Sequence, residues 1–178
     1  MVSADLLLHP VRLRIVHAMY RDRALTTAEL CERLPDVSTA TMYRQVAQLV
    51  DGGMLEIDSE QKVRGVVERR YRLPMANATM STEDVEAMTP DDHRRGMAAV
   101  VATILAEFDL YLDRDDVDVI ADGVGYRQQS IWLNDEELAA IYGELRRVLS
   151  TVDGHPGEGK RRRLMTLISF PTDERPST

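Results

Sequence analysis

The sequence predicts an α+β protein: a helical N-terminal unit closed by a β-hairpin, then one long helix, then a small α/β layer. Three observations lead to this prediction. Apolar residues recur at helical spacing as far as the paired glycines Gly52-Gly53, after which they alternate as in a strand. A second, longer helical pattern begins at Pro90. Beyond it, an alternating, a helical and another alternating segment follow one another.

Two helices are expected in the first part of the chain. Residues 6–20 carry one apolar stripe at helical spacing, in which Pro10 is tolerable only near the first turn. Residues 25–35 open with Thr26 and Glu29 at the spacing of a capping box and end at a proline. A two-residue turn then separates this helix from the next, which is the arrangement of a helix-turn-helix.

A third helix is expected over residues 38–51, with Ser38 as its N-cap and the paired glycines at its end. Its apolar stripe consists of Met42, Val46, Leu49 and Val50. The other face carries hydrogen-bonding side chains and no acid: Thr39, Thr41, Tyr43, Arg44, Gln45 and Gln48. Such side chains read base edges and hold phosphates, so this is predicted to be a recognition helix in the major groove. A core position is the alternative for Tyr43.

A hairpin is expected over residues 54–73, with strands at 54–57 and 66–73 and with Lys62 and Arg64 at the tip. A hairpin directly after a recognition helix is a wing, which is predicted to lie on the DNA backbone. An ordinary loop role is the alternative for the two cations. The predicted DNA-binding residues are Ser38, Thr39, Thr41, Tyr43, Arg44, Gln45, Gln48, Lys62 and Arg64.

Residues 5–73 resemble the winged helix-turn-helix regulators of the ArsR type. Four segments in the same order carry this resemblance: His9-Pro10-Val11-Arg12-Leu13-Arg14-Ile15, Leu25-Thr26-Thr27-Ala28-Glu29-Leu30, Ser38-Thr39-Ala40-Thr41-Met42-Tyr43-Arg44 and Gly52-Gly53-Met54-Leu55-Glu56. The resemblance implies a homodimeric, operator-binding transcription factor. Metal-sensing members use a Cys-Val-Cys or clustered Asp and His on a late helix, and neither pattern is present. We therefore expect no metal and no cofactor.

The long helix is predicted over residues 90–112, after a linker at 75–89. Thr89 is a suitable N-cap, and Pro90 fits the first helical position. Large apolar residues then alternate in steps of four and three, as in a coiled coil. These residues are Met97, Val101, Ile104, Phe108 and Tyr111. They are predicted to form the interface of a homodimer.

The C-terminal region is predicted as strand 124–133, a helix starting at Asn134 and strand 164–170, with a disordered tail at 173–178. Parallel strands are the default for such a crossover, and the antiparallel arrangement stays open. The basic run 160–163 is expected to pair with the acidic residues of this half rather than with phosphate.

Aromatic residues suggest where a small organic effector would bind. We expect such a molecule to contact the C-terminal half near Phe108, Tyr126 and Trp132. For Trp132, the core of the C-terminal sheet is the preferred prediction and an effector-pocket wall the alternative. The predicted domains are a DNA-binding domain at 1–74, the linker at 75–89, a dimerisation and C-terminal region at 90–172, and the tail.

The amino-acid composition is compatible with nucleic-acid binding when the charges of the two halves of the chain are counted separately. The net charge of the 178 residues is −8, but residues 1–80 hold 11 basic and 10 acidic residues, and residues 81–178 hold 11 and 20. Since phosphate affinity depends on the field within about 10 Å, the acidic half does not exclude DNA binding by the other half. Many arginines beside only two lysines are typical of a high-GC bacterial genome.

The remaining features favour a cytoplasmic regulator. Cys31 is the only cysteine, there is no signal-peptide pattern, and no apolar run approaches the roughly 18 residues of a membrane span. No phosphate-binding glycine loop or nucleophile motif indicates an enzyme. The sequence thus predicts a DNA-binding transcriptional regulator acting as a homodimer. A winged-helix adaptor for protein interactions, without operator binding, is the alternative.

Overall fold

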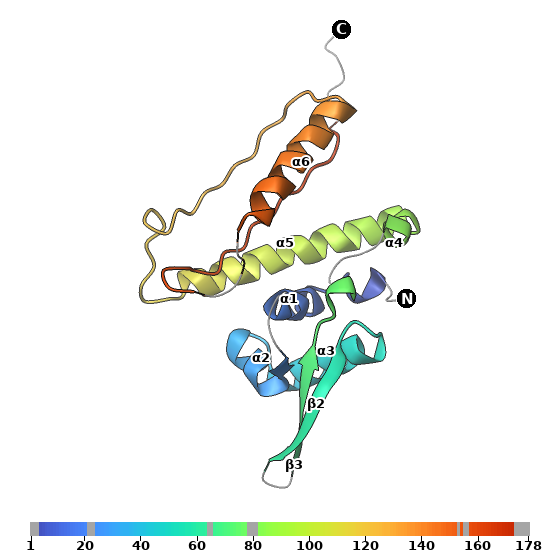
Figure 1. Ribbon diagram of the computed structural model, residues 1–178, viewed down its shortest axis with the longest axis vertical. Coiled ribbons are helices and arrows are strands. Elements are labelled where there is room, and N and C mark those ends of the chain that lie inside the picture. Colours follow the sequence, from blue (N-terminus) through green and yellow to red (C-terminus); the bar gives the residue numbers. More distant parts are fainter. Residues whose placement is uncertain are drawn as a thin grey trace. The chain divides into compact units, whose positions relative to one another are not determined.

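The computed structural model describes residues 4–20, 24–63, 66–77, 82–152, 154 and 157–172. The chain forms two compact units, residues 1–111 and 112–178. Figure 1 shows the helices and strands of each unit in chain order. None of the helices within the described ranges is long and apolar enough to cross a membrane.

Three helices build the core of the first unit (Figure 1): α1 (Pro10–Met19), α2 (Thr27–Arg33) and α3 (Thr39–Asp51). A short 3-10 helix, η1 (Ala4–Leu6), precedes α1. The first α-helix therefore begins later than expected, because the ring of Pro10 fits the first position of a helix and not its interior. The largest fully buried side chains of these helices include Ile15, Met19, Leu30, Met42, Val46 and Leu49.

Local hydrogen bonds set the ends of α2 and α3. The Glu29 N–H donates to Thr26 Oγ1 over 3.1 Å, and the Thr26 N–H donates to Glu29 Oε2 over 2.7 Å, which confirms the predicted capping box. Ser38 caps α3 by accepting from the Thr41 N–H over 3.3 Å. After α3, Gly53 has a φ of +73°, a conformation that glycine adopts without a steric penalty.

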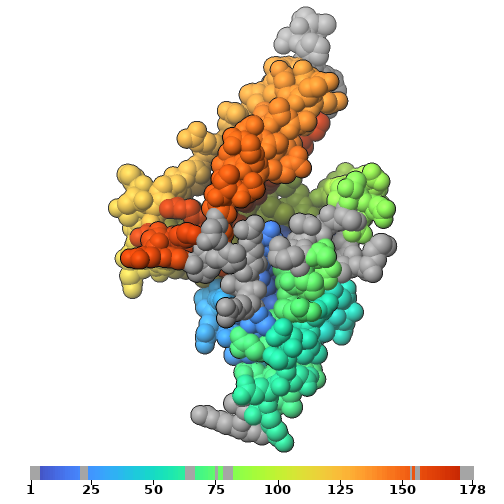
Figure 2. Space-filling view, in the orientation of Figure 1, coloured from blue at the N-terminus to red at the C-terminus, as the bar shows by residue number. Residues whose placement is uncertain are grey.

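A three-stranded antiparallel sheet flanks the helices, in the order β1 (Leu25–Thr26), β3 (Val66–Arg72), β2 (Glu56–Val63). The hairpin β2–β3 is the predicted wing, and it projects as a narrow arm beyond the helices (Figure 2). The short strand β1 was not expected from the sequence. It pairs Leu25 with Tyr71, which ties the turn before α2 to the base of the wing.

The first wing strand differs from the prediction. It begins at Glu56 and continues to Val63, so residues 59–63 are paired strand and not a connecting loop. Met54 and Leu55 are buried in the core, and their N–H groups both donate to the Leu49 carbonyl, at 2.8 and 3.1 Å. Met54 and Leu55 thus donate to a terminal carbonyl of α3 and do not form the start of the strand. The last carbonyls of a helix lack partners within the helix and need such donors.

The segment after the wing contains η2 (Met75–Asn77), α4 (Thr82–Glu86) and the long helix α5 (Pro90–Leu112), whose bounds match the predicted ones. Thr89 caps α5: its Oγ1 accepts from the Asp92 N–H over 3.2 Å, and its own N–H donates to Asp92 Oδ2 over 2.9 Å. The residues buried on α5 are Ala99 and Thr103. A Cβ added at Gly96 would meet the side chain of Leu8 at 3.2 Å.

Small residues therefore form the face of α5 that packs on the N-terminal elements. The predicted seam of large residues is not that face, since Met97 and Val101 remain 40% and 43% exposed. The structure places α5 up to Tyr111 with the winged helix, whereas the sequence grouped it with the C-terminal region.

The second unit contains one helix, α6 (Asp135–Ser150), within its described residues. Its start at the N-cap Asn134 is confirmed, because Asn134 Oδ1 accepts from the Glu137 N–H over 2.8 Å and Glu137 Oε2 accepts from the Asn134 N–H over 2.9 Å. No residue of α6 is buried. Arg161 pairs with the carboxylate of Asp122, as predicted for the basic run, whereas Arg163 donates to the backbone carbonyl of Asp122.

The predicted α/β layer of this unit is wrong. Residues 124–133 and 164–170 have no regular secondary structure and form no strand. Alternating apolar residues favour an extended backbone, but a strand also requires a hydrogen-bonded partner, which the pattern does not specify. Trp132, 83% exposed, is accordingly not in a sheet core. The predicted disordered tail at 173–178 lies outside the described residues.

Candidate nucleic-acid interface

The outer face of α3 carries most of the polar side chains predicted for it. Ser38, Thr39, Tyr43, Arg44 and Gln48 are exposed, and Thr41 is partly buried. Tyr43 is 59% exposed, which excludes the alternative of a core position. The helix has no acidic residue before Asp51, so its exposed face offers donors and one cation without a competing carboxylate.

Gln45 is the exception, and its prediction as part of the exposed face is wrong. Its side chain is only 3% exposed, and its Oε1 has no hydrogen-bond partner within the described residues. The sequence held the signal for this. Met42, Gln45, Val46 and Leu49 follow the spacing i, i+3, i+4, i+7, so Gln45 occupies a position of the core stripe.

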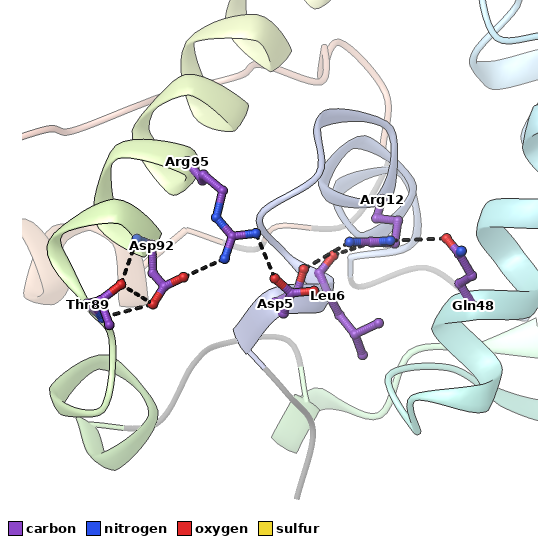
Figure 3. A network of polar contacts seen from close by, with 7 residues as sticks. All are labelled: Asp5, Leu6, Arg12, Gln48, Thr89, Asp92 and Arg95. Carbon is purple, nitrogen blue, oxygen red and sulfur yellow. Dashed lines mark hydrogen bonds and ion pairs between the residues drawn. The ribbon is translucent and has the colours of Figure 1, made fainter.

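Arg12 of α1 reaches the outer face of α3 and holds one of its side chains (Figure 3). Its Nη1 donates to Gln48 Oε1 over 3.0 Å. Its other nitrogens donate to backbone carbonyls, Nε to Leu6 at 2.6 Å and Nη2 to Asp5 at 2.9 Å. All three nitrogens of the guanidinium are thus engaged. No sequence pattern predicts this contact, because its two partners are 36 residues apart.

One further cation, Arg44, lies on the same side of the domain as Arg12. The pKa of His9 is lowered by burial first and then by the cations Arg12 and Arg44. His9, at the N-cap of α1, is therefore close to the exposed Arg44. Together, Arg12 and Arg44 form a cationic area on this side of the domain, of the kind that attracts phosphate.

The wing contributes less positive charge than its sequence suggests. Lys62 is exposed near its tip, and Arg64 lies outside the described residues. Two arginines of β3 pair with acids of β2: Arg69 with Glu60 at 2.7 Å and Arg72 with Glu56 at 2.8 Å. These cross-strand ion pairs neutralise cations that would otherwise be available to DNA.

A buried arginine supports α3 from behind. Arg14 is 4% exposed and donates to both carboxylate oxygens of Asp36, in the turn that precedes α3, at 2.6 and 2.8 Å. Its Nε donates to Glu107 of α5 over 3.2 Å. Arg14 therefore links α1, the turn of the helix-turn-helix and α5. Sequence reasoning missed it, because nothing local distinguishes it from a surface arginine.

Two of the aromatic residues predicted to contact an effector are largely exposed. Tyr126 and Trp132 are 80% and 83% exposed, so neither lines an enclosed surface. In the predicted dimer seam, Met97 and Val101 are exposed, whereas Ile104, Phe108 and Tyr111 are partly buried. The rings of Phe108 and Tyr111 stack, with their centroids 5.9 Å apart. Within the described ranges, no three His, Cys, Asp or Glu side chains come together as a metal site would require.

Comparison with known proteins supports the helix-turn-helix. No curated protein matches the chain significantly. Residues 7–58 match the family model described as a helix-turn-helix domain, a span that runs from the end of η1 to the start of β2 and includes α1, α2 and α3. The N-terminal part of this chain is thus similar to a helix-turn-helix domain, the kind of domain found in DNA-binding regulators.

Proposed function

We propose that this protein is a sequence-specific transcriptional regulator that inserts α3 into the major groove of DNA. The observation that carries the proposal is the exposed face of α3, with Thr39, Tyr43, Arg44 and Gln48 on a helix whose other face is locked in the core. The match of residues 7–58 to a helix-turn-helix family supports the same reading. In such domains the second helix of the pair enters the groove.

Arg44 and Lys62 have different roles in this proposal. Arg44 lies in the first half of α3, where its planar fork can reach guanine O6 and N7 together. Lys62 lies near the tip of a projecting wing, where a flexible ammonium meets a phosphate. Ser38, Thr39, Thr41 and Tyr43 supply hydroxyl groups for backbone or base contacts around them.

The proposal includes a homodimer formed through α5. The face of α5 that packs on the N-terminal elements consists of small residues, which leaves Met97 and Val101 of the seam, and the neighbouring Leu105 and Leu112, exposed to a partner chain. Met97, Val101, Leu105 and Leu112 are 40%, 43%, 59% and 45% exposed. A two-fold dimer would place two copies of α3 on successive turns of one face of DNA.

The test begins with selection of bound sequences from a random duplex library. The affinity of the selected and scrambled duplexes is then measured by fluorescence anisotropy across a salt series. A regulator should prefer the selected duplex, and its affinity should fall steeply with salt. Arg147→Ala is the matched control, since it removes one exposed arginine of α6, outside the residues that match the helix-turn-helix model. Equal affinity for all duplexes would contradict the proposal.

An adaptor for protein interactions is the second candidate, and the wing is the observation that favours it. Its arginines Arg69 and Arg72 are occupied by Glu60 and Glu56, so the wing is a weaker phosphate ligand than its composition suggests. An adaptor would show no salt-dependent DNA binding in the same experiment. The exposed positions of Tyr126 and Trp132 give no support to an effector site, so an effector is not part of this proposal.

A further inference from the structure

Within the described residues, Arg12 of α1 forms hydrogen bonds but no ion pair. All three of its bonds go to neutral oxygens: the carbonyls of Leu6 and Asp5, at 2.6 and 2.9 Å, and the amide oxygen of Gln48, at 3.0 Å. Arg14 of the same helix, in contrast, is paired with two carboxylates. The charge of Arg12 is therefore left for an anion from outside the chain.

The acid next to Arg12 holds the arginine in place without neutralising it. Figure 3 shows Asp5 between two arginines: its backbone carbonyl accepts from Arg12, and its carboxylate accepts from Arg95 of α5 over 3.0 Å. The segment is also packed on the end of α3, because a Cβ added at Gly52 would overlap the side chain of Leu6. The guanidinium of Arg12 is thus positioned in advance, which reduces the entropy that a ligand contact costs.

The guanidinium of Arg12 still has donors for such a ligand. An arginine has five N–H groups. The three hydrogen bonds leave two of these groups, one on Nη1 and one on Nη2. The bonds that these two nitrogens make are exposed, so a ligand can approach them. Two N–H groups in one plane match two oxygens of a phosphate.

Arg12 lies beside the part of α3 that is proposed to read bases. Its partner Gln48 comes four residues after Arg44, so these two side chains are neighbours on one exposed face of the helix. Arg12 and Arg44 are also both close enough to His9 to lower its pKa, a shift whose largest cause is burial. Arg44 forms no ion pair with a described residue either. Two unpaired cations near each other favour the binding of a polyanion.

We propose that Arg12 binds a phosphate of the DNA backbone next to the base pairs that α3 reads. The DNA interface then extends from α3 to α1, a helix outside the helix-turn-helix pair. This inference rests on the proposed DNA binding by α3. Because every nucleotide step carries a phosphate, Arg12 contributes to the affinity for all duplexes and not to the choice of bases.

The experiment compares the wild type, Arg12→Met and Arg147→Met by fluorescence anisotropy on the selected and scrambled duplexes across a salt series. Arg12→Met should weaken binding to both duplexes by the same factor and lower the slope of log affinity against log salt by about 0.9 per subunit. Its deficit should therefore shrink by about eightfold per subunit over a tenfold rise in salt. Arg147→Met removes one arginine charge from α6 and should bind as the wild type does. A wild-type slope in folded Arg12→Met would overturn the inference.

A second pair of variants shows whether Arg12 acts directly or through Gln48. Gln48→Ala removes the partner of Arg12 on α3 but no charge, so its salt slope should equal that of the wild type. Arg12→Met added to Gln48→Ala should still lower the slope by about 0.9 per subunit. If this effect vanishes in the Gln48→Ala background, Arg12 acts only by holding Gln48, and the inference is wrong.

Duplexes with a single methylphosphonate locate the contact, since this group replaces one charged phosphate oxygen by a methyl group. At one phosphate per bound subunit, the substitution should weaken the wild type and leave Arg12→Met unaffected. If Arg12→Met fails to fold, as judged by circular dichroism, Arg12→Gln replaces it, because its amide retains donors for the carbonyls of residues 5 and 6 without the charge. Equal penalties for the wild type and the variant at every phosphate would contradict the proposed contact.

The failures of the two proposals are distinguishable. If the wild type shows no salt-dependent preference for any duplex, the proposed DNA binding itself is wrong. The inference alone is wrong if the wild type prefers the selected duplex and Arg12→Met keeps the wild-type salt slope. It is also wrong if Arg12→Met loses affinity for the selected duplex only, because Arg12 then reads a base.

Discussion

Arg14 and Asp36 form a bidentate ion pair that anchors the turn before α3. The two terminal nitrogens of Arg14 lie 2.6 and 2.8 Å from the two carboxylate oxygens of Asp36, two residues before the N-cap Ser38. Arg14 is 4% exposed and Asp36 is 40% exposed. A guanidinium buried to this extent depends on its partners, because burying an unpaired charge is costly.

Removal of the acidic partner should therefore destabilise the winged helix. We expect Asp36→Ala to lower the free energy of unfolding by about 1–3 kcal/mol, the range for charged hydrogen bonds, with Glu107 as the remaining partner of Arg14. Urea denaturation followed by circular dichroism measures the change. Asp91→Ala is the control, since it breaks an exposed pair with Arg94 worth well under about 1 kcal/mol. If Asp36→Ala and Asp91→Ala lose the same free energy of unfolding, the burial of Arg14 is energetically unimportant.

The same ion pair predicts how stability depends on pH. The hydrogen bonds from Arg14 hold the pKa of Asp36 below its usual value of 3.8. Since the folded-state pKa is the lower one, the stabilisation is complete at neutral pH and is lost as the pH falls through 3.8 toward the folded-state value. Asp36→Asn lacks this carboxylate, so its deficit relative to the wild type should narrow on acidification. Urea denaturation between pH 7 and pH 2 tests this, and a deficit independent of pH would contradict it.

The cap of α5 should lose stability over a defined acidic range. Hydrogen bonds from Thr89, first, and then from Arg95 lower the pKa of Asp92 from 3.8 to about 2. Protonation of Asp92 should therefore weaken the start of α5 between these two values. Far-ultraviolet circular dichroism measures the helical signal to which α5 contributes. We expect Asp92→Asn at neutral pH to show the same loss of this signal from the start of α5 as protonation of Asp92 causes in the wild type near pH 2. The exposed Asp91→Asn, one residue away, serves as its control.

Replacement of Arg44 and replacement of Lys62 should have different effects on DNA affinity. Arg44→Ala should weaken binding to the selected duplex by about 1–3 kcal/mol and leave scrambled DNA nearly unaffected. Lys62→Ala should weaken both duplexes alike and reduce the slope of log affinity against log salt by about one per wing. Fluorescence anisotropy on both duplexes across a salt series distinguishes these outcomes. If Arg44→Ala loses the same affinity for both duplexes, Arg44 contacts phosphate and does not read a base.

Charge on the exposed stripe of α5 should break the proposed dimer without unfolding the subunit. Val101 and Leu105 are 43% and 59% exposed in the single chain, so Val101→Glu and Leu105→Glu remove little internal packing. In a dimer, each such side chain contributes roughly 1.5–3 kcal/mol on burial. Sedimentation velocity should show a dimer for the wild type and monomers for both variants. Val67→Glu, which replaces a valine of the wing that is 54% exposed, should remain dimeric. A monomeric wild type at all concentrations would refute the proposed interface.

The sequence by itself determined the features that depend on neighbours within one helical turn. Thr26 with Glu29 and Asn134 with Glu137 are capping boxes three residues apart, and both are present. The start of α5 at Pro90 and the end of α3 before Gly53 follow from the same kind of local geometry. In each case the donor, the acceptor and the backbone conformation are all specified by adjacent residues, so no other part of the chain has to be known.

Tertiary structure decided the features that depend on distant partners. Arg12 meets Gln48 across 36 residues, and Arg14 meets Glu107 across 93, and neither arginine differs locally from one exposed to water. The side of α5 facing the domain is lined by Ala99 and Thr103, because close helix approach favours small side chains, while hydrophobic periodicity alone singled out the large ones. The segments 124–133 and 164–170 have the alternation of strands but do not form strands in the structure. Burial and strand pairing are properties of two surfaces in contact, and a pattern along one segment describes only one of them.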